Sequence, residues 1–276
     1  MKPAGTLPQN TSARIFGYTG RTTLSALAYL GGLLRLFGEA LTWSFVWPFR
    51  GKPIRRAATF QQMVRVGFRS VPIVGMVLFF VGVILALQMA YVLQKFGVTQ
   101  YIASVVGVGI IRELGPLITA IVMTGFAGAS IAAELGTMKV SEEILALETS
   151  ALDPMRFLVV PRVLACMVMF LCLTILGDLI GIFGGFCVSV SFLDVDPYVY
   201  FHKTTEYLIN KDIVSGLVKA EVFGIIVSLV ACYEGLSVEG GAEGVGRATT
   251  MSVVLSIVFI ILADCILTWL FYFLLK

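Results

Sequence analysis

Long runs of apolar residues, separated by short polar stretches, are the main feature of this sequence. Five of them reach the roughly 20 residues that a helix needs to cross a bilayer. They lie at about 71–93, 105–133, 163–190, 213–233 and 251–275. The alternation of apolar and polar residues that marks the strands of a membrane barrel is not found. The pattern therefore predicts an all-α polytopic membrane protein with five transmembrane helices.

Residues 24–49 show a different pattern, because apolar and polar residues fall on opposite sides of a helix. The apolar side holds Leu27, Leu30, Leu34, Phe37, Leu41 and Phe45, and the other side holds Gly32, Arg35, Glu39 and Thr42. This arrangement is typical of a helix that lies in the membrane interface. A sixth span is the alternative, but Arg35 and Glu39 would each cost about 2.5 kcal/mol or more at bilayer depth.

The start of the chain is expected to lie in the cytoplasm. Residues 1–23 lack the pattern of a signal peptide, so we expect a loose lead-in to the interfacial helix. Six basic residues precede the first span: Arg50, Lys52, Arg55, Arg56, Arg65 and Arg69. The positive-inside rule places this side in the cytoplasm. The chain thus divides into an N-terminal tail with its interfacial helix, residues 1–56, and a membrane domain, residues 57–276.

Composition supports the membrane class and argues against several others. Of the 276 residues, 58% are hydrophobic and only 13% are charged. The net charge of +3 forms no basic stripe, so nucleic-acid binding has little support. The only histidine is His202, and the five cysteines lie in or beside apolar runs without CxxC spacing. A metal site, a disulfide framework and histidine-based catalysis therefore lack the residues that they need.

The segment 234–250 is rich in glycine and is predicted to be a loop. It contains neither GxxxxGK[ST] nor GxGxxG, so it cannot be assigned phosphate chemistry. We therefore expect no catalytic residue and no cofactor in this chain. If ATP drives its function, a separate chain must hydrolyse the ATP.

Two other features concern the connections between spans. Gly177, Gly181 and Gly185 recur at four-residue spacing in the third span, which favours close approach of another helix. The polar connector 194–212 is expected outside the membrane, with a short surface helix within it.

A charged segment, residues 134–162, separates the second span from the third on the cytoplasmic side. Ser141 is predicted to cap a short helix whose first turn holds Glu142 and Glu143. Its apolar face would hold Ile144, Leu147 and Ala151. The helix should stop near Asp153-Pro154, where Asp153 can cap a second helix. Such an element docks a partner or is an interfacial helix without one, and the residues alone leave both readings open.

Arg112 and Glu113 lie well inside the second apolar run and are followed by Pro116. Because Pro116 cannot donate to the carbonyl of Arg112, we expect the helix to loosen there. Adjacent helical residues point about 100° apart, so each charge needs a partner elsewhere. The candidates are Lys219, Glu221, Asp178 and Asp264, or the same residues of a second protomer. These charges either join helices or line a cavity for a substrate with a charged head group.

One apolar stripe on the first span consists of Leu85, Met89, Val92, Leu93 and Phe96. It is explained by packing, by contact with membrane lipid or by an acyl-chain pocket. Acidic residues inside spans are also compatible with proton coupling, so an ion-coupled secondary transporter of an amphiphilic substrate is the alternative function. No internal repeat supports an inverted-repeat transporter.

Two long motifs resemble a known family. They read IIRELGPLITAIVMTGFAGASIAAELGTMKVSEEILALETSALDPMRFLVVPRVLA and GGAEGVGRATTMSVV. Both are similar to the MlaE/YrbE permeases of ABC-type lipid transporters associated with Mce-domain proteins. The resemblance runs from roughly Ala57 to the C-terminus.

The resemblance implies a homodimeric permease of the bacterial inner membrane. It implies an N-terminal interfacial helix, five spans, a cytosolic coupling helix and a short periplasmic helix. The implied partners are a cytosolic ABC ATPase that holds ATP and Mg, a periplasmic Mce-domain lipid-binding protein and, in some systems, a STAS-domain subunit. The implied substrate is phospholipid.

The resemblance also suggests roles for individual residues. Coupling to the ATPase would involve Glu134, Lys139, Glu142, Glu143, Asp153 and Arg156. With the stripe on the first span included, the candidate lipid-binding residues are Leu85, Met89, Val92, Leu93, Phe96, Arg112, Glu113, Lys219 and Arg247.

Overall fold

The computed structural model describes residues 11–43 and 55–274, and within these ranges every regular element is a helix. The α-helices are α1 (Thr11–Leu41), α2 (Arg56–Val66), α3 (Val71–Lys95), α4 (Ile102–Gly109), α5 (Gly115–Met123), α6 (Ala129–Val140), α7 (Glu143–Thr149), α8 (Val160–Phe192), α9 (Pro197–Tyr207), α10 (Asn210–Leu236) and α11 (Gly241–Leu274). Short 3₁₀ elements are η3 (Phe68–Ser70) and η4 (Thr99–Tyr101), and π-helical elements are η5 (Ile110–Leu114), η6 (Thr124–Gly128) and η7 (Met155–Val159).

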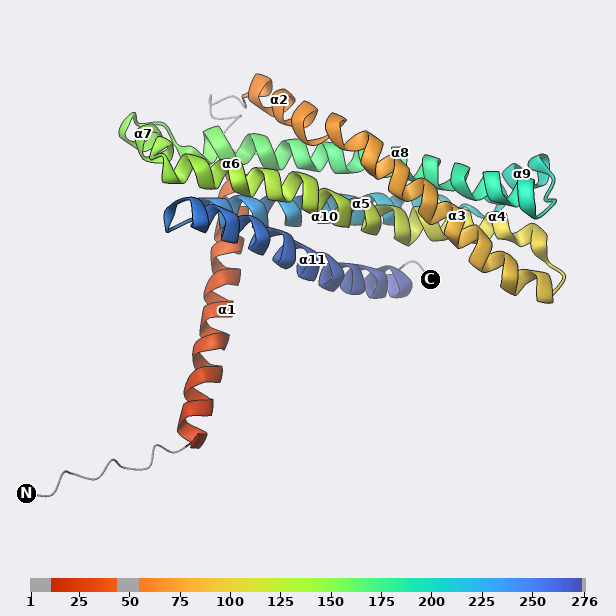
Figure 1. The fold of residues 1–276 in the computed structure, drawn as a ribbon, viewed down its shortest axis with the longest axis horizontal. Helices are drawn as coiled ribbons and strands as arrows, with labels where there is room; N and C mark the ends of the chain where they lie inside the picture. The colour runs from red at the N-terminus through yellow and green to blue at the C-terminus, as the bar shows by residue number, and fades with distance from the viewer. Residues whose placement is uncertain (1–10, 44–54, 275–276) are drawn as a thin grey trace, which may run out of the picture.

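Several of these elements join into five continuous helices that are long and apolar enough to cross a membrane. They are Arg56–Lys95, Thr99–Val140, Met155–Phe192, Asn210–Leu236 and Gly241–Phe273. They run side by side as one bundle, with α7 at one end and α9 at the other (Figure 1). The predicted all-α polytopic fold is confirmed. Four of the predicted spans fall within these helices, and the fifth, 251–275, overlaps Gly241–Phe273 but extends past the described residues.

The predicted loop 234–250 is wrong. The helix α10 continues to Leu236, α11 already begins at Gly241, and only residues 237–240 connect them. The glycines permit close packing here: a Cβ at Gly244 would overlap the carbonyl oxygen of Glu239, and a Cβ at Gly136 would lie 2.9 Å from Val238. Gly244 and Gly136 therefore serve close packing, whereas Gly240 and Gly241 adopt positive φ in the short connection.

The first helix, α1, starts earlier than expected and leaves the bundle (Figure 1). Residues 11–23 are helical, so the loose lead-in is wrong for them, while residues 1–10 and 44–54 lie outside the described ranges. Gly32, predicted on the polar side, faces the ring of Tyr233 on α10, and Leu36 and Ala40 are buried. The α1 helix runs across the long axis of the bundle and is absent from the five candidate spans found among the described residues.

The predicted close approach at the third span is confirmed, because α8 packs against α3 through its glycines. A Cβ at Gly82 of α3 would overlap the carbonyl oxygen of Gly181, and a Cβ at Gly184 would overlap that of Phe79. Two backbones in contact leave no freedom to rotate or slide without a clash. The pair α3 and α8 therefore forms a fixed frame for the rest of the bundle.

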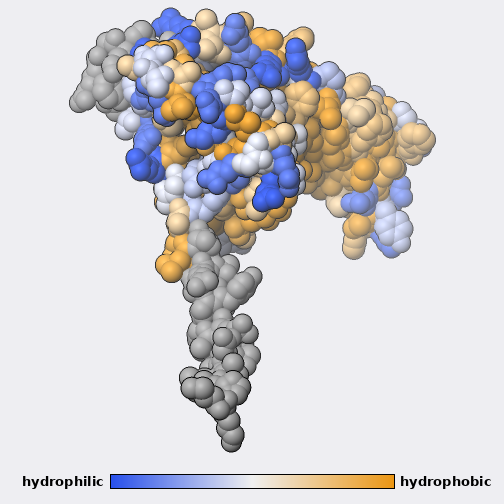
Figure 2. All heavy atoms as spheres, turned by 60° about the vertical axis from the view of Figure 1, so that its left-hand side comes forward, coloured by the Kyte–Doolittle hydropathy of each residue, from blue (hydrophilic) through white to orange (hydrophobic). Residues whose placement is uncertain are grey.

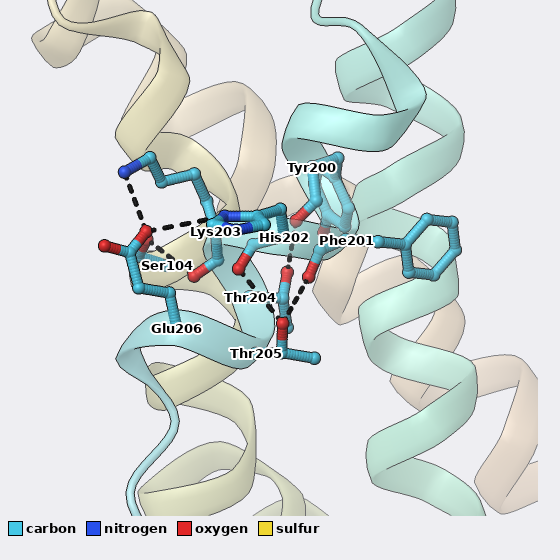
Figure 3. A network of polar contacts seen from close by, with 8 residues as sticks. All are labelled: Ser104, Tyr200, Phe201, His202, Lys203, Thr204, Thr205 and Glu206. Carbon is cyan, nitrogen blue, oxygen red and sulfur yellow. Dashed lines mark hydrogen bonds and ion pairs between the residues drawn. The ribbon is translucent and has the colours of Figure 1, made fainter.

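At the α9 end, a network of polar contacts fixes the predicted surface helix (Figure 3). Asp196 caps α9 by accepting from the N–H groups of Tyr198 and Val199. Ser104 of α4 donates to the Lys203 carbonyl at 3.2 Å. The Lys203 ammonium donates to Glu206 at 2.8 Å, and this bond lowers the pKa of Glu206 and raises the pKa of Lys203.

Candidate functional site

The charged pair inside the second span sits on a distorted stretch of helix. Residues Ile110–Leu114 form the π-helix η5, directly before Pro116. The loosening expected at Pro116 is therefore confirmed. A Cβ at Gly216 of α10 would overlap the carbonyl oxygen of Ile111, and a Cβ at Gly115 would overlap the carboxylate of Asp178 on α8. The widened turn is thus held between α8 and α10.

Glu113 belongs to a partly buried cluster that we call the Lys219 cluster, formed by Glu113, Lys219, Asp264 and Thr268. The Lys219 ammonium, 1% exposed, donates to Glu113 and, at 2.7 Å, to the Thr268 hydroxyl. It also lies 2.9 Å from Asp264 Oδ1, and the Thr268 hydroxyl donates to Glu113 at 3.1 Å. One ammonium thus holds two carboxylates from α11 and η5. Lys219 and Asp264 were among the predicted partners.

Arg112 has a different partner. Its guanidinium lies 3.7 Å from Asp212 Oδ1, at the start of α10, and 41% of its side chain is exposed. Asp212 was not among the predicted partners, because the sequence analysis placed it in the external connector. The expectation that Arg112 and Glu113 do not neutralise each other holds, since their partners lie on α10 at Asp212 and at Lys219.

The two charges also line two different cavities, and Tyr272 of α11 lines both. One, of about 410 Å³, is bordered by the polar residues Arg112, Lys211, Asp212, Ser215 and Tyr272. The other, of about 500 Å³, is bordered by Glu113, Asp264, Thr268, Trp269 and Tyr272, among others. Both pockets are open to the surface, so these polar groups are accessible at the edge of an otherwise apolar bundle, as a site for a charged head group requires.

Other predicted lipid-binding residues lie elsewhere. Leu85 lies 3.5 Å from the position that a Cβ at Gly109 would take. Leu85 and Leu93 both pack against an apolar cluster of buried residues around Ala90 and Ile102. Val92 and Phe96 are exposed, and Met89 is half-buried. Arg247 is 81% exposed and pairs with Glu243 at 3.6 Å. It precedes Asp264 by 17 positions on one helix, or roughly 25 Å at 1.5 Å per residue, so within one chain it is remote from the Lys219 cluster.

The predicted coupling residues gather at the α7 end, where hydrophilic side chains cover the bundle while its flank is largely hydrophobic (Figure 2). Lys139, Glu142, Glu143 and Asp153 are exposed. The Arg156 guanidinium lies 5.9 Å from the ring of Phe157. Four of the six predicted coupling residues are thus accessible to a partner.

The capping of α7 was predicted incorrectly at its start and its end. Ser141 donates to the Thr137 carbonyl, and Glu142, in left-handed conformation at φ 59°, occupies the N-cap. The helix ends at Thr149, so Ala151 lies beyond it and is exposed rather than on its apolar face. The second cap is confirmed, since Asp153 accepts from the Met155 N–H at 2.9 Å. Ile144 is buried and anchors α7 on the bundle.

Glu134, also predicted as a coupling residue, makes contacts inside the chain. Its carboxylate lies 2.9 Å from Arg65 of α2 and 3.1 Å from Arg162 of α8. Arg162 is 4% exposed and also donates to the Leu158 carbonyl at 2.7 Å. Glu134 therefore ties three helices together beside α7. The sequence analysis included Arg162 only as the last residue of the charged segment 134–162 and missed this cluster.

Thr268 was also missed, although its position four residues after Asp264 places it on the same face of α11 and could have indicated it. Asp212 gave no such signal, because its partner is 100 positions away in the sequence.

Five apolar helices with charged groups that border open pockets identify a multi-pass membrane protein. The comparisons specify the family: residues 59–270 match the family model of the MlaE permease. A probable ABC transporter permease of Rickettsia prowazekii is 41% identical over 241 residues, covering 87% of this chain and 92% of the relative. A probable ABC transporter permease of Synechocystis is 37% identical over 219 residues (79% and 83%). The intermembrane phospholipid transport permease MlaE of Haemophilus influenzae is 34% identical over 209 residues (75% and 80%). The chain belongs to the MlaE permease family.

Proposed function

We propose that this protein is the permease subunit of an ATP-driven transporter that moves phospholipid between the bacterial inner membrane and a periplasmic Mce-domain partner. The observation that carries the proposal is the pair of polar pockets beside Arg112 and Glu113, which open at the surface of an otherwise apolar bundle. A phospholipid combines a charged head group with apolar chains, and such a site suits both parts. The name of the Haemophilus relative supports the same substrate.

In this proposal the α7 end faces the cytoplasm, together with the N-terminus. A cytosolic ABC ATPase binds ATP and Mg and docks on the exposed residues Lys139, Glu142, Glu143 and Asp153. Ile144 anchors α7 to the bundle, and Glu134 joins α2, α6 and α8 beside it. In this proposal a displacement of α7 is therefore transmitted to these three helices. That mechanical link favours docking over a surface helix without a partner.

We also propose a homodimer. Glu113 is 35% exposed and faces the cavity bordered by Trp269 and Tyr272, whose side chains are themselves exposed. A carboxylate that faces membrane lipid is costly. A second copy that packs on α11 would enclose this cavity between two protomers and remove that cost. A STAS-domain subunit is a further proposed partner in the assembled complex.

Charge reversal on α7 tests the coupling role. With Glu142→Lys and Glu143→Lys together, lipid-stimulated ATPase activity of the assembled complex is expected to fall at least tenfold, because two negative charges on the proposed docking surface become positive. Both side chains are exposed, so folding should change little. Asp194→Lys, at the opposite end of the bundle, serves as the control. Unchanged stimulation in the α7 variant would remove α7 from the docking site.

Removal of the guanidinium tests the head-group role. Arg112→Ala is expected to reduce the phospholipid that co-purifies with the permease by about tenfold, the effect of one lost charge-assisted hydrogen bond. Quantitative lipid mass spectrometry of the purified protein measures this. Equal lipid content in the variant and the parent protein would place the head group elsewhere.

The ion-coupled alternative has one observation in its favour, the carboxylates of Glu113 and Asp264 inside the bundle. The two functions differ in their partners. A pull-down from native membranes that recovers an ATPase subunit supports the ABC transporter. Transport that stops when the proton gradient is dissipated, while ATP hydrolysis continues, supports the alternative.

A further inference from the structure

An open pocket lies on α2, at the end of the bundle that holds α7 (Figure 1). We call it the α2 pocket. It has a volume of about 440 Å³ and is bordered by Phe60, Gln61, Val64, Arg65 and Arg69. Because α2 continues into α3 as one helix that is long and apolar enough to cross a membrane, Arg56–Lys95, the pocket lies just before the apolar run of that helix.

The apolar side chains in and beyond the α2 pocket are exposed. Phe60 is 68% exposed and Val64 is 47% exposed. Ile73 and Met76 follow Arg69 on the same face of the helix, at i+4 and i+7, and both are exposed as well. An apolar surface therefore leads from the pocket along the membrane-spanning part of the helix, where acyl chains can lie against it.

The α2 pocket also carries positive charge that the protein does not neutralise. Arg65, 46% exposed, lies 2.9 Å from Glu134, and the same carboxylate lies 3.1 Å from the buried Arg162. Arg69 is exposed and forms no ion pair within residues 11–43 and 55–274. Two guanidiniums thus share one carboxylate, and a third, with five N–H donors, has none.

These features match an anionic phospholipid. Guanidiniums bind phosphate oxygens in pairs. Basic residues beside the end of a span lie at the level of the lipid head groups and attract anionic lipids. Exposed aromatic and aliphatic side chains next to them suit acyl chains, so one ligand satisfies both halves of the surface. The uncompensated charge of Arg69 also disfavours a zwitterionic head group, whose cation it would repel.

We propose that the α2 pocket binds the phosphate of an anionic phospholipid from the leaflet at the α7 end of the bundle, with Arg69 as its main contact. The site is separate from the proposed head-group site, because Arg112 lies beside the start of α10, toward α9. It therefore does not depend on transport. Since Arg65 borders the pocket and also holds Glu134, a lipid bound here reaches the cluster that joins α2, α6 and α8.

Native mass spectrometry of the purified full-length permease tests the site. The probes are phosphatidylglycerol and phosphatidylcholine with the same chains, and every protein carries Arg112→Ala so that the site beside Arg112 does not contribute. Arg69→Met is expected to weaken binding of phosphatidylglycerol about tenfold, as the loss of one charged contact predicts, and to leave phosphatidylcholine unchanged. Arg69→Lys keeps the charge and should bind more tightly than Arg69→Met. Arg56→Met is the matched control, because Arg56 is exposed on the same helix but does not border the pocket.

Three results would overturn the proposal. The first is equal binding of the two lipids by the Arg112→Ala protein, and the second is a preference for phosphatidylglycerol that survives Arg69→Met. The third is an equal loss in Arg56→Met, which would mean that the lipid responds to surface charge in general. If glycerol phosphate, which lacks the chains, displaces phosphatidylglycerol at equal concentration, the pocket takes free phosphate and the lipid assignment is wrong. Arg69→Gln replaces the methionine variant if size-exclusion chromatography shows that the latter is misfolded. The proposed function is tested separately, by the lipid content of Arg112→Ala alone.

Discussion

Replacing Lys219 by methionine is expected to destabilise the permease by about 3–5 kcal/mol, the usual effect of removing one partner from a buried ion pair. The Lys219 ammonium is 1% exposed and is the cation between Glu113 and Asp264. Without it, two carboxylates from different helices would face each other in a low-dielectric environment. They would repel each other, or one would take up a proton, and either response costs free energy. Denaturant-induced unfolding in mixed micelles measures the loss.

A compensated variant distinguishes the structural role of the cluster from its functional role. The triple change Lys219→Met, Glu113→Gln and Asp264→Asn leaves no unpaired charge, so most of the lost stability should return. Lipid-stimulated ATPase activity should not return, because the head group would meet no charge there. If the triple variant recovers both, the cluster only joins helices. Lys203→Met, whose exposed partner is Glu206, should change stability little because solvent screens that pair.

The spans and the intramembrane charges were predictable because each follows from a local rule. A run of about 20 apolar residues has one stable form in lipid. Pro116 necessarily removes a hydrogen bond four residues back, so the distortion at Arg112 needed no tertiary information. The cap at Asp153 is equally local, since the donor lies two residues away.

Except at the start of α7, the failures share a physical cause, which is packing between distant segments. Glycines in 234–250 indicate a loop by their backbone freedom, yet Gly235 packs within α10 against Leu135 and Ala132 of α6, and only the short connection uses the positive φ of Gly240 and Gly241. Ser141 has the chemistry of an N-cap, but the left-handed turn at Glu142 moves the start of α7 by one residue. Arg112 forms an ion pair with Asp212, and Glu134 forms ion pairs with two arginines. No spacing rule relates positions that far apart in the sequence.

Removal of the Glu134 carboxylate should be nearly as damaging as the Lys219 change. Glu134→Ala leaves Arg162, 4% exposed, with the Leu158 carbonyl but without its carboxylate, so a loss of about 3–5 kcal/mol is expected. A contact residue for the ATPase would behave differently, since its replacement would impair coupling and leave the isolated permease stable. Unfolding of the permease alone, compared with ATPase stimulation in the complex, therefore decides which role Glu134 has.

A second replacement shows whether the charge of Arg162 is the cause. In Glu134→Ala with Arg162→Met no buried cation remains, and stability should partly recover. The matched control is Glu39→Ala, because Glu39 pairs with the exposed Arg35 on one helix, and such pairs contribute only about 0.3–0.5 kcal/mol. If Glu134→Ala is as stable as this control and only coupling is lost, Glu134 contacts the ATPase directly. If stability falls and Arg162→Met restores it, Glu134 acts by neutralising the buried Arg162 in the three-helix tie beside α7.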